Sequence, residues 1–187
     1  MQVTAKVTIG QSKMIMKSLF APVEVGGLTE ECLMFREMLQ SDRQLSEKEI
    51  PALLEQGEYG TLAVLGDDDY AYAVPLNYVY EAGKIYIHGS KDGHKVDALQ
   101  SNPKVSFCVI SDATVKPEQF TFSYTSVIAF GVATLLKEKE KRTAIERFVH
   151  KYSAEHWDRA QKIIPNVWDK FVIFEIAIEH VTAKQKR

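Results

Sequence analysis

The sequence predicts a mainly β fold, an antiparallel barrel with helices on its periphery. Six apolar segments of strand length follow one another at hairpin spacing, separated by turn residues such as Gly66–Asp69 and Glu81–Lys84. Other segments have their apolar residues at helical spacing instead. With 187 residues, 45% of them hydrophobic, the chain can bury a core of its own. Short strands joined by hairpins favour a barrel over a doubly wound sheet.

Each expected element has its own signal. The expected strands are Tyr59–Leu65, Tyr70–Tyr80, Ile85–His88, Lys104–Ile110, Phe122–Leu136 and Phe171–Ile178. A capping box of Ser46 and Glu49 opens a first helix that ends at Gly57, with Pro51 as an alternative start. Further helices are expected at His94–Gln100 and Lys137–Tyr152.

Irregular segments are expected between and after these elements. Ser111–Phe120 is expected to be a loop, the fifth strand to be broken or bulged near Tyr124–Ser126, and the residues after Ile178 to form a polar tail. Pro75 lies inside the second strand and cannot donate a ladder hydrogen bond. That point must therefore be an edge, a bulge or an opening in the sheet.

Bulk composition limits the classes of partner. A net charge of −2 without a basic, aromatic-rich face argues against nucleic acid. No run reaches the roughly 20 apolar residues of a membrane span, and the N-terminus lacks the pattern of a signal peptide. Cys32 and Cys108 lie far apart and are interpreted as reduced thiols. A cytoplasmic protein without a metal site is expected, since no histidine pair has metal-ligand spacing.

The N-terminal segment, residues 1–33, is treated separately from a domain at residues 34–187. Val3, Ala5, Val7 and Ile9 alternate with polar residues, a period typical of a strand. The segment is either an added edge strand or an extension upstream of an original start at Met34. No function is assigned to it.

The segment from Ile85 to Lys95 has the composition of an anion site. A strand runs into a loop with two glycines, a serine and lysines, and then into a helix. Glycines let backbone N–H groups approach an anion, and a helix N-terminus adds donors and a favourable dipole. A phosphate group suits this mixture; a solvated loop with incidental lysines is the alternative interpretation.

The preceding strand could line a flat ring. Tyr72–Tyr78 is apolar, is interrupted by Pro75 and carries one amide, Asn77. Backbone groups freed near Pro75 could bond the polar edge of a heteroaromatic ring. The pattern alone equally suits an ordinary core strand.

Several runs resemble the nitroimidazole-resistance (Nim) family, one of the pyridoxamine 5'-phosphate oxidase-like flavin proteins. The resemblance covers about Met34 to Lys184, in order and at family spacing. It is carried by Gly60–Val64, Tyr72–Tyr80, the loop through Asn102-Pro103, and Tyr124–Gly131. It departs from the family at Thr182-Ala183-Lys184, where the family usually has Thr-Gly-Lys.

The resemblance implies a six-stranded antiparallel split β-barrel of the FMN-binding type, working as a homodimer with flavin at the interface. FMN is the expected cofactor, with FAD as the alternative and haem, on His88 or His94, as a third option. The residues implied to bind the flavin are Val74, Pro75, Leu76, Asn77, His88, Gly89, Ser90, Lys91, Gly93, His94, Lys95, Tyr124 and Ser126. Tyr124 and Ser126 belong either to the same site or to the partner's side of it. His88 is also the candidate catalytic residue.

The expected function is reduction of a small electron-poor molecule such as a nitroaromatic. The flavin performs the redox chemistry and His88 donates a proton, since histidine titrates near pH 6.5. One alternative is oxidation of a pyridoxamine-type phosphate ester, disfavoured because Tyr70–Tyr80 carries no Arg or Lys. The other is a non-catalytic flavin- or haem-binding protein.

Overall fold

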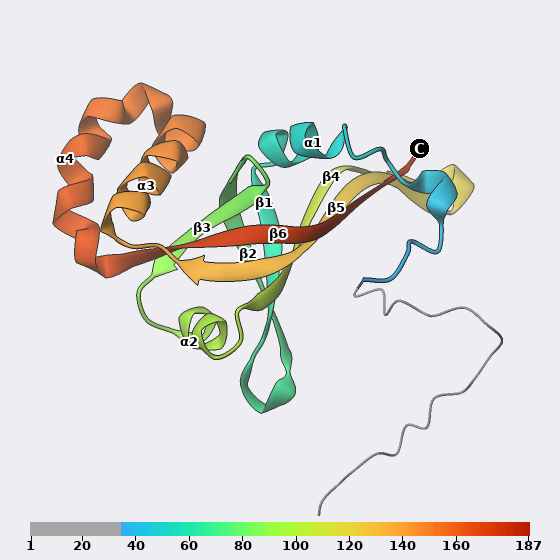
Figure 1. Cartoon of the computed structure of the whole chain (residues 1–187). Helices are drawn as coiled ribbons and strands as arrows, with labels where there is room; N and C mark the ends of the chain where they lie inside the picture. Colours follow the sequence, from blue (N-terminus) through green and yellow to red (C-terminus); the bar gives the residue numbers. More distant parts are fainter. Residues whose placement is uncertain (1–34) are drawn as a thin grey trace, which may run out of the picture. The chain divides into compact units, whose positions relative to one another are not determined.

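Six antiparallel strands close into a barrel in the order β1-β2-β3-β6-β5-β4 (Figure 1). The computed structural model describes residues 35–187. The strands are β1 (Tyr59–Leu65), β2 (Ala71–Glu81), β3 (Lys84–Ser90), β4 (Lys104–Lys116), β5 (Thr121–Leu135) and β6 (Phe171–Lys186). The predicted six-stranded antiparallel barrel is confirmed. The expectations for residues 1–33 lie outside the described residues.

Helices lie around the barrel, as the sequence predicted. They are α1 (Ile50–Gln56), α2 (His94–Ser101), α3 (Glu138–Ser153) and α4 (Trp157–Val167). Figure 1 shows α3 and α4 side by side at one end, with α2 set apart from them beside the lower part of the barrel. Short 3-10 turns occur at Ser41–Arg43, Asp67–Asp69, Pro117–Gln119, Ala154–His156 and Trp168–Lys170.

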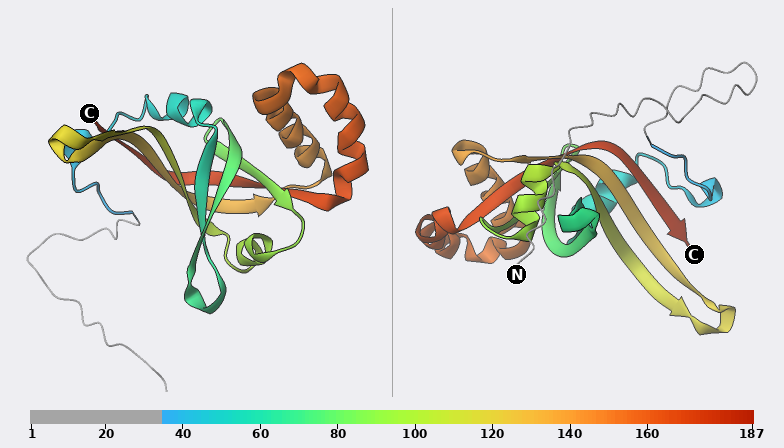
Figure 2. Two further views of the ribbon diagram at one scale, coloured as in Figure 1. Left: turned by 180° about the vertical axis from the view of Figure 1, so that it is seen from behind. Right: turned by 90° about the horizontal axis from the view of Figure 1, so that it is seen from below.

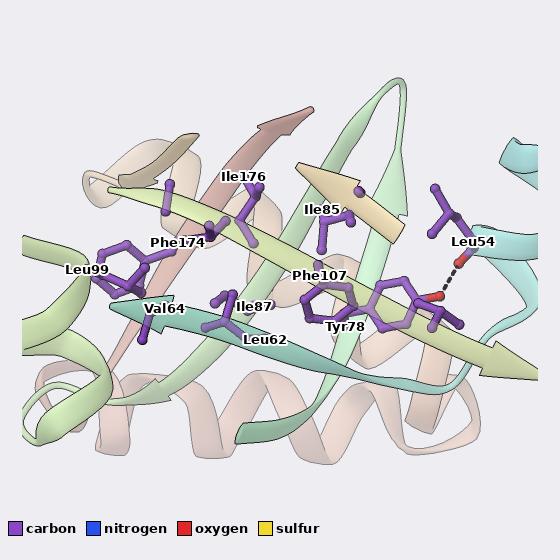
Figure 3. Packing of buried hydrophobic residues seen from close by; sticks show 14 of the residues in the cluster. Leu54, Leu62, Val64, Tyr78, Ile85, Ile87, Leu99, Phe107, Phe174 and Ile176 are labelled. Carbon is purple, nitrogen blue, oxygen red and sulfur yellow. Dashed lines mark hydrogen bonds between the residues drawn. The ribbon is translucent and has the colours of Figure 1, made fainter. Parts of the chain in front are cut away.

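The barrel interior is filled by alternate residues of the strands. Leu62, Ile87 and Phe107 are fully buried there, and Tyr78 packs edge-on against Phe107 with ring centroids 5.0 Å apart (Figure 3). The Tyr78 hydroxyl donates a 2.8 Å hydrogen bond to the carbonyl of Leu54 in α1. Burial raises the pKa of Tyr78 far above its usual value, so the hydroxyl stays a donor.

A turn closed by Ser46 and Glu49 precedes α1, whose N-cap residue, Glu49, makes no side-chain capping bond to the helix. The backbone N–H and hydroxyl of Ser46 donate to the Glu49 carboxylate at 2.9 and 2.7 Å. These bonds lower the pKa of Glu49, with the Ser46 hydroxyl the larger cause. The helix begins at Ile50, between the two predicted starts, and buries Ile50 and Leu54.

A second cluster covers the outer face of β2, β3 and β6. Val79, Tyr86 and Ile173 from these strands pack against Ala144 and Phe148 of α3. Because paired residues of neighbouring strands share a face, this cluster marks the outside of the barrel there. The strands are thus buried on both faces only where α3 lies.

The prediction of a loop at Ser111–Phe120 is wrong. β4 continues to Lys116 and pairs with β5, with a register shift between Ser111 and Thr114 opposite Tyr124. Asp112 takes a left-handed φ of 53° at this bulge. The predicted break or bulge of the fifth strand near Tyr124–Ser126 is wrong, because β5 runs without a break and the extra residue lies opposite it on β4. This hairpin projects from the barrel (Figure 2), and the β4 residues in it are mostly exposed. The sequence therefore lacks the alternation of apolar and polar residues that predicts a half-buried strand.

The C-terminal prediction is also corrected, because β6 runs on to Lys186 instead of ending at Ile178. Its polar end pairs with β5 along the same projecting arm, from Tyr124↔Lys186 to Phe130↔His180. Helix α4, Trp157–Val167, is a further element that the sequence pattern did not predict. Its apolar residues Trp157, Ala160, Ile164 and Val167 have helical spacing, a signal interrupted by Pro165.

Candidate functional site

The barrel is split between β2 and β3. Their ladder covers only Tyr78–Glu81 and Lys84–Ile87, while the earlier part of β2 pairs with β1 alone. The end of β3, His88–Ser90, pairs with β6 alone. Pro75 lies in the part of β2 without a partner on this side, so the predicted opening of the sheet is confirmed.

The loop after β3 and the first turn of α2 lie beside this opening. Gly93 precedes α2 with a φ of 118°, a conformation that other residues rarely adopt, and an added Cβ would meet nothing within 4 Å. Its carbonyl accepts bonds from the N–H groups of Val96 and Asp97, closing the first turn. A pocket of about 240 Å³ lies here, lined by Tyr72, Val74, Ser90, Asp92, Gly93, His94, Lys95 and Val96.

Lys95 is the half-buried cation of this pocket. Its Nζ donates a 3.3 Å hydrogen bond to the carbonyl of His88. A Cβ at Gly89 would lie 2.2 Å from that Nζ, so the missing side chain is what lets the amine cross the strand. Burial lowers the pKa of Lys95, and no carboxylate lies within salt-bridge distance among residues 35–187. An anion in the pocket would offset this desolvation.

His94 is held by neighbours outside the loop. Its ring stacks on Tyr72 with centroids 4.2 Å apart and planes 24° from parallel. Nε2 lies 3.4 Å from the backbone N–H of Asp67 and accepts a hydrogen bond from it. The side chain therefore joins α2 to the turn between β1 and β2 and forms one wall of the pocket.

His88 is not among the residues that line this pocket. Its ring packs edge-on against Phe148 of α3 at 4.6 Å, on the outer face of the barrel. Burial lowers the pKa of His88, and nearby Lys95 lowers it further. The imidazole is therefore neutral at pH 7, and its predicted catalytic role stays a prediction.

The four residues Val74–Asn77 do not share one face. Val74 and Leu76 are half-buried and pack against the barrel core, whereas Pro75 and Asn77 are exposed on the outer side. Side chains alternate along a strand, so a flat ring on either face would touch only two of the four. Of these, Val74 reaches the 240 Å³ pocket.

The remaining predicted residues divide between the two regions. Ser90, Gly93, His94 and Lys95 line the pocket; Gly89 and Lys91 adjoin it. Tyr124 lines a different hollow of about 260 Å³, together with Asp112, Lys116 and the C-terminal residues.

Ser126 lies outside both hollows, paired with Ile110 and Lys184. Thr182-Ala183-Lys184, where the chain departs from the family pattern, lies inside β6, with Ala183 buried.

Sequence reasoning missed three lining residues. Tyr72 has the alternation signal, because it is two residues from Val74 and shares its face. Asp92 lies inside the predicted loop but was not selected, since a carboxylate does not suit an anion site. Val96, the next residue of α2 after Lys95, could be recognised as a lining residue only after the pocket had been located.

Two further features of residues 35–187 bear on function. None of their helices is long and apolar enough to cross a lipid bilayer. No group of three or more His, Cys, Asp and Glu side chains is placed to hold a metal ion in this part of the chain.

The closed antiparallel barrel, opened between β2 and β3 and bordered there by a helix, defines a split-barrel protein. A model of the pyridoxamine 5'-phosphate oxidase family matches residues 46–185. Since this is most of the chain, the protein belongs to that family. The wider family predicted from the sequence is confirmed, and membership of the nitroimidazole-resistance branch stays a prediction.

Two individual proteins are similar to this chain. An uncharacterized protein of Rhizobium meliloti (strain 1021), RA0666, is 33% identical over 72 residues, which are 38% of this chain and 46% of that protein. The match thus spans less than half of that relative. A FAD-binding protein of Mesorhizobium loti is similar in structure, with 28% identity, a TM-score of 0.53, and coverage of 76% of this chain and 95% of the other.

A candidate 5-nitroimidazole antibiotic resistance protein of Bacteroides thetaiotaomicron has the same fold. Its TM-score is 0.63 at 19% identity, covering 76% of this chain and 86% of that one. At this identity, the likeness concerns the fold alone.

Proposed function

We propose that this chain binds the phosphate end of a flavin nucleotide, FMN or FAD, in the pocket between β2, β3 and α2, and reduces small electron-poor molecules such as nitroaromatics. Membership of the pyridoxamine 5'-phosphate oxidase family and likeness to a FAD-binding protein support the cofactor. The resemblance of the sequence to nitroimidazole-resistance proteins supports the substrate class.

The observation that carries the proposal is the environment of Lys95. A half-buried ammonium group that has a carbonyl as its hydrogen-bond partner is poorly compensated. A phosphate dianion would supply the missing charge through a charge-assisted bond. Ser90 offers a hydroxyl in the same pocket, and the accessible backbone at Gly93 leaves room for close approach.

The pocket is too small to hold the whole flavin nucleotide. About 240 Å³ is below the roughly 300–1,000 Å³ of ordinary small-molecule sites, so the phosphate end fits and the ring system lies outside. The backbone edge of β2 that has no strand partner beside Pro75 is the surface proposed for that ring. A ring left on an open strand is exposed to water, so a second copy of the chain is needed to cover it.

Exposed apolar residues on the projecting arm favour such a homodimer. Val115, Phe120 and Phe122 are 72%, 98% and 53% exposed, which is costly for an isolated arm. In the proposed dimer this arm lies against the other copy, and Tyr124 and Ser126 approach the flavin from the partner side. Light-scattering mass measured at several concentrations tests the dimer; a monomer at all concentrations contradicts it.

When bound, the flavin supplies the hydride-transfer chemistry, and the chain supplies binding, orientation and proton control. Lys95 and Ser90 fix the phosphate end, and the β2 backbone orients the ring. Burial, and to a smaller extent Lys95, lower the pKa of His88, so its imidazole would first have to take up a proton before it could pass one to the substrate.

The His88→Gln variant tests this role, because it is expected to retain flavin and lose turnover. Unchanged turnover removes His88 from the mechanism and leaves cofactor binding intact.

The decisive experiment identifies the cofactor and then weakens its site. Mass analysis of the compound released from purified protein distinguishes FMN, FAD and haem. Lys95→Met is expected to weaken flavin binding, whereas Lys104→Met, a matched change at an exposed lysine in β4, leaves it unchanged. Anaerobic reduction of a nitroimidazole by the reduced flavoprotein then tests the activity. A protein that takes up neither flavin nucleotide contradicts the proposal.

A second candidate is oxidation of a pyridoxamine-type phosphate ester, which the family match favours. It is ranked lower because β2, Ala71–Glu81, has no Arg or Lys to bind a second phosphate. Formation of an aldehyde from pyridoxamine 5'-phosphate under oxygen would replace the reductase proposal. A flavoprotein inactive with both substrate types would instead be a carrier.

A further inference from the structure

We propose a second small-molecule site, for a small apolar carboxylate, between helices α3 and α4. A pocket of about 300 Å³ lies there, at the lower end of the range of ligand sites. It is lined by Val149, Ser153, His156, Arg159, Ala160, Ile163 and Ile164. All of these belong to a helix hairpin that is separate in sequence from the pocket beside α2, so this inference stands independently of the flavin proposal.

The floor of the pocket is hydrocarbon. Val149 and Ile164 come from facing helices, and Ala160 leaves the space that a longer side chain would fill. Ile164 is buried, whereas Ile163 is 44% exposed and adds accessible apolar surface to the lining. Covering this surface with an apolar ligand would remove it from water.

The polar groups at the pocket select an anion. Ser153, His156 and Arg159 are its polar lining, and no carboxylate is among the lining residues. His156 already has Glu155 at 3.4 Å, whereas Arg159 has no carboxylate within salt-bridge distance in residues 35–187. An arginine guanidinium matches the two oxygens of a carboxylate in a bidentate pair.

Together these features specify an amphiphile. A ligand with a short aliphatic or aromatic body and a terminal carboxylate would place its body on the Val149–Ile164 floor and its charge at Arg159. A cationic ligand of the same length would meet like charge, and a neutral one would leave Arg159 unpaired. The site therefore discriminates by the sign of the head group.

Calorimetric titration of the full chain with octanoate, and with octylammonium as the charge-reversed probe, tests the proposal. Octanoate is expected to bind and octylammonium is not. Arg159→Gln should weaken octanoate binding about fivefold, a modest loss because Arg159 is exposed and partly screened by solvent. Lys162→Gln is the matched control: it removes a neighbouring exposed cation outside the pocket and should leave affinity unchanged.

Two further variants test the apolar floor. Ala160→Trp fills the pocket and should abolish binding; circular dichroism and thermal unfolding report whether the variant is folded. Ile163→Glu introduces a carboxylate at an exposed position that folding tolerates, and should also abolish octanoate binding by repulsion. Three results would overturn the proposal. The first is that octanoate does not bind at all, and the second is that it binds no better than octylammonium. The third is that Arg159→Gln and Ile163→Glu bind octanoate as tightly as the unmodified chain does.

Discussion

Replacing Gly89 by alanine should separate anion binding from folding. The new Cβ would lie 2.2 Å from Lys95 Nζ, and ordinary contact begins at 3.4 Å, so the amine must leave its position over the strand. The displaced atom is the end of a flexible side chain, and alanine is better than glycine in a strand by about 0.5–1 kcal/mol. The free energy of unfolding should therefore change by less than about 1 kcal/mol.

The effect on phosphate binding should be much larger. A hydrogen bond to a charged group contributes about 1.5–3 kcal/mol, which corresponds to roughly a tenfold to hundredfold change in the dissociation constant of FMN. Fluorescence quenching of FMN by apoprotein measures this constant. Riboflavin, which lacks the phosphate, is the control ligand, and its binding should not change between the two proteins.

A double-mutant cycle identifies the cause. In a Lys95→Ala background there is no amine to displace, so Gly89→Ala should have no further effect on FMN affinity. If Gly89→Ala weakens FMN equally in both backgrounds, the glycine acts on the ligand directly and the reasoning about Lys95 is refuted. Equal losses for FMN and riboflavin would place the defect at the ring instead of the phosphate.

Two further predictions concern stability. Tyr78→Phe removes the buried hydrogen bond to the Leu54 carbonyl and should lower the free energy of unfolding by about 1–3 kcal/mol. The melting temperature should fall by about 2–4 °C for each kcal/mol. Unchanged thermal unfolding would show that the carbonyl finds another donor. The lowered pKa of His88 means that the unfolded chain binds a proton first as pH falls below about 6.5, so stability falls with it. In His88→Gln, denaturant unfolding between pH 7 and 5 should show a smaller loss; an identical slope in both proteins would mean that His88 titrates normally.

The spacing of apolar residues predicted the helices and strands that have one buried face, and it failed for strand segments without one. β1, Tyr59–Leu65, was predicted to the residue because its inner side chains alternate with exposed ones. The end of β4 was interpreted as a loop because its residues beyond Cys108 are mostly exposed, and the end of β6 as a tail because its residues around buried Ala183 are mainly polar. In the projecting arm the strands are held by backbone pairing and by polar side-chain hydrogen bonds such as that from Gln185 to Thr125, and neither produces an alternation of apolar residues in the sequence.

The candidate site shows a similar division. Its loop was predicted because glycines, a serine and lysines next to a helix N-terminus are local in sequence. The wall formed by Tyr72 depends on strand pairing, and the distance between Tyr124 and the pocket depends on barrel closure. The orientation of His88 towards Phe148 could not be predicted, since it requires α3 to fold back across β3.

The bulged end of β4 also has a consequence for how copies of this protein behave at high concentration. Beyond Cys108, no strand in the described part of the chain lies along the outer edge of β4. A free edge of this kind is a template on which any extended peptide can add itself. The left-handed Asp112 and the charge of Lys116 interrupt that template, so straightening the bulge would be expected to turn a discrete protein into one that assembles edge to edge.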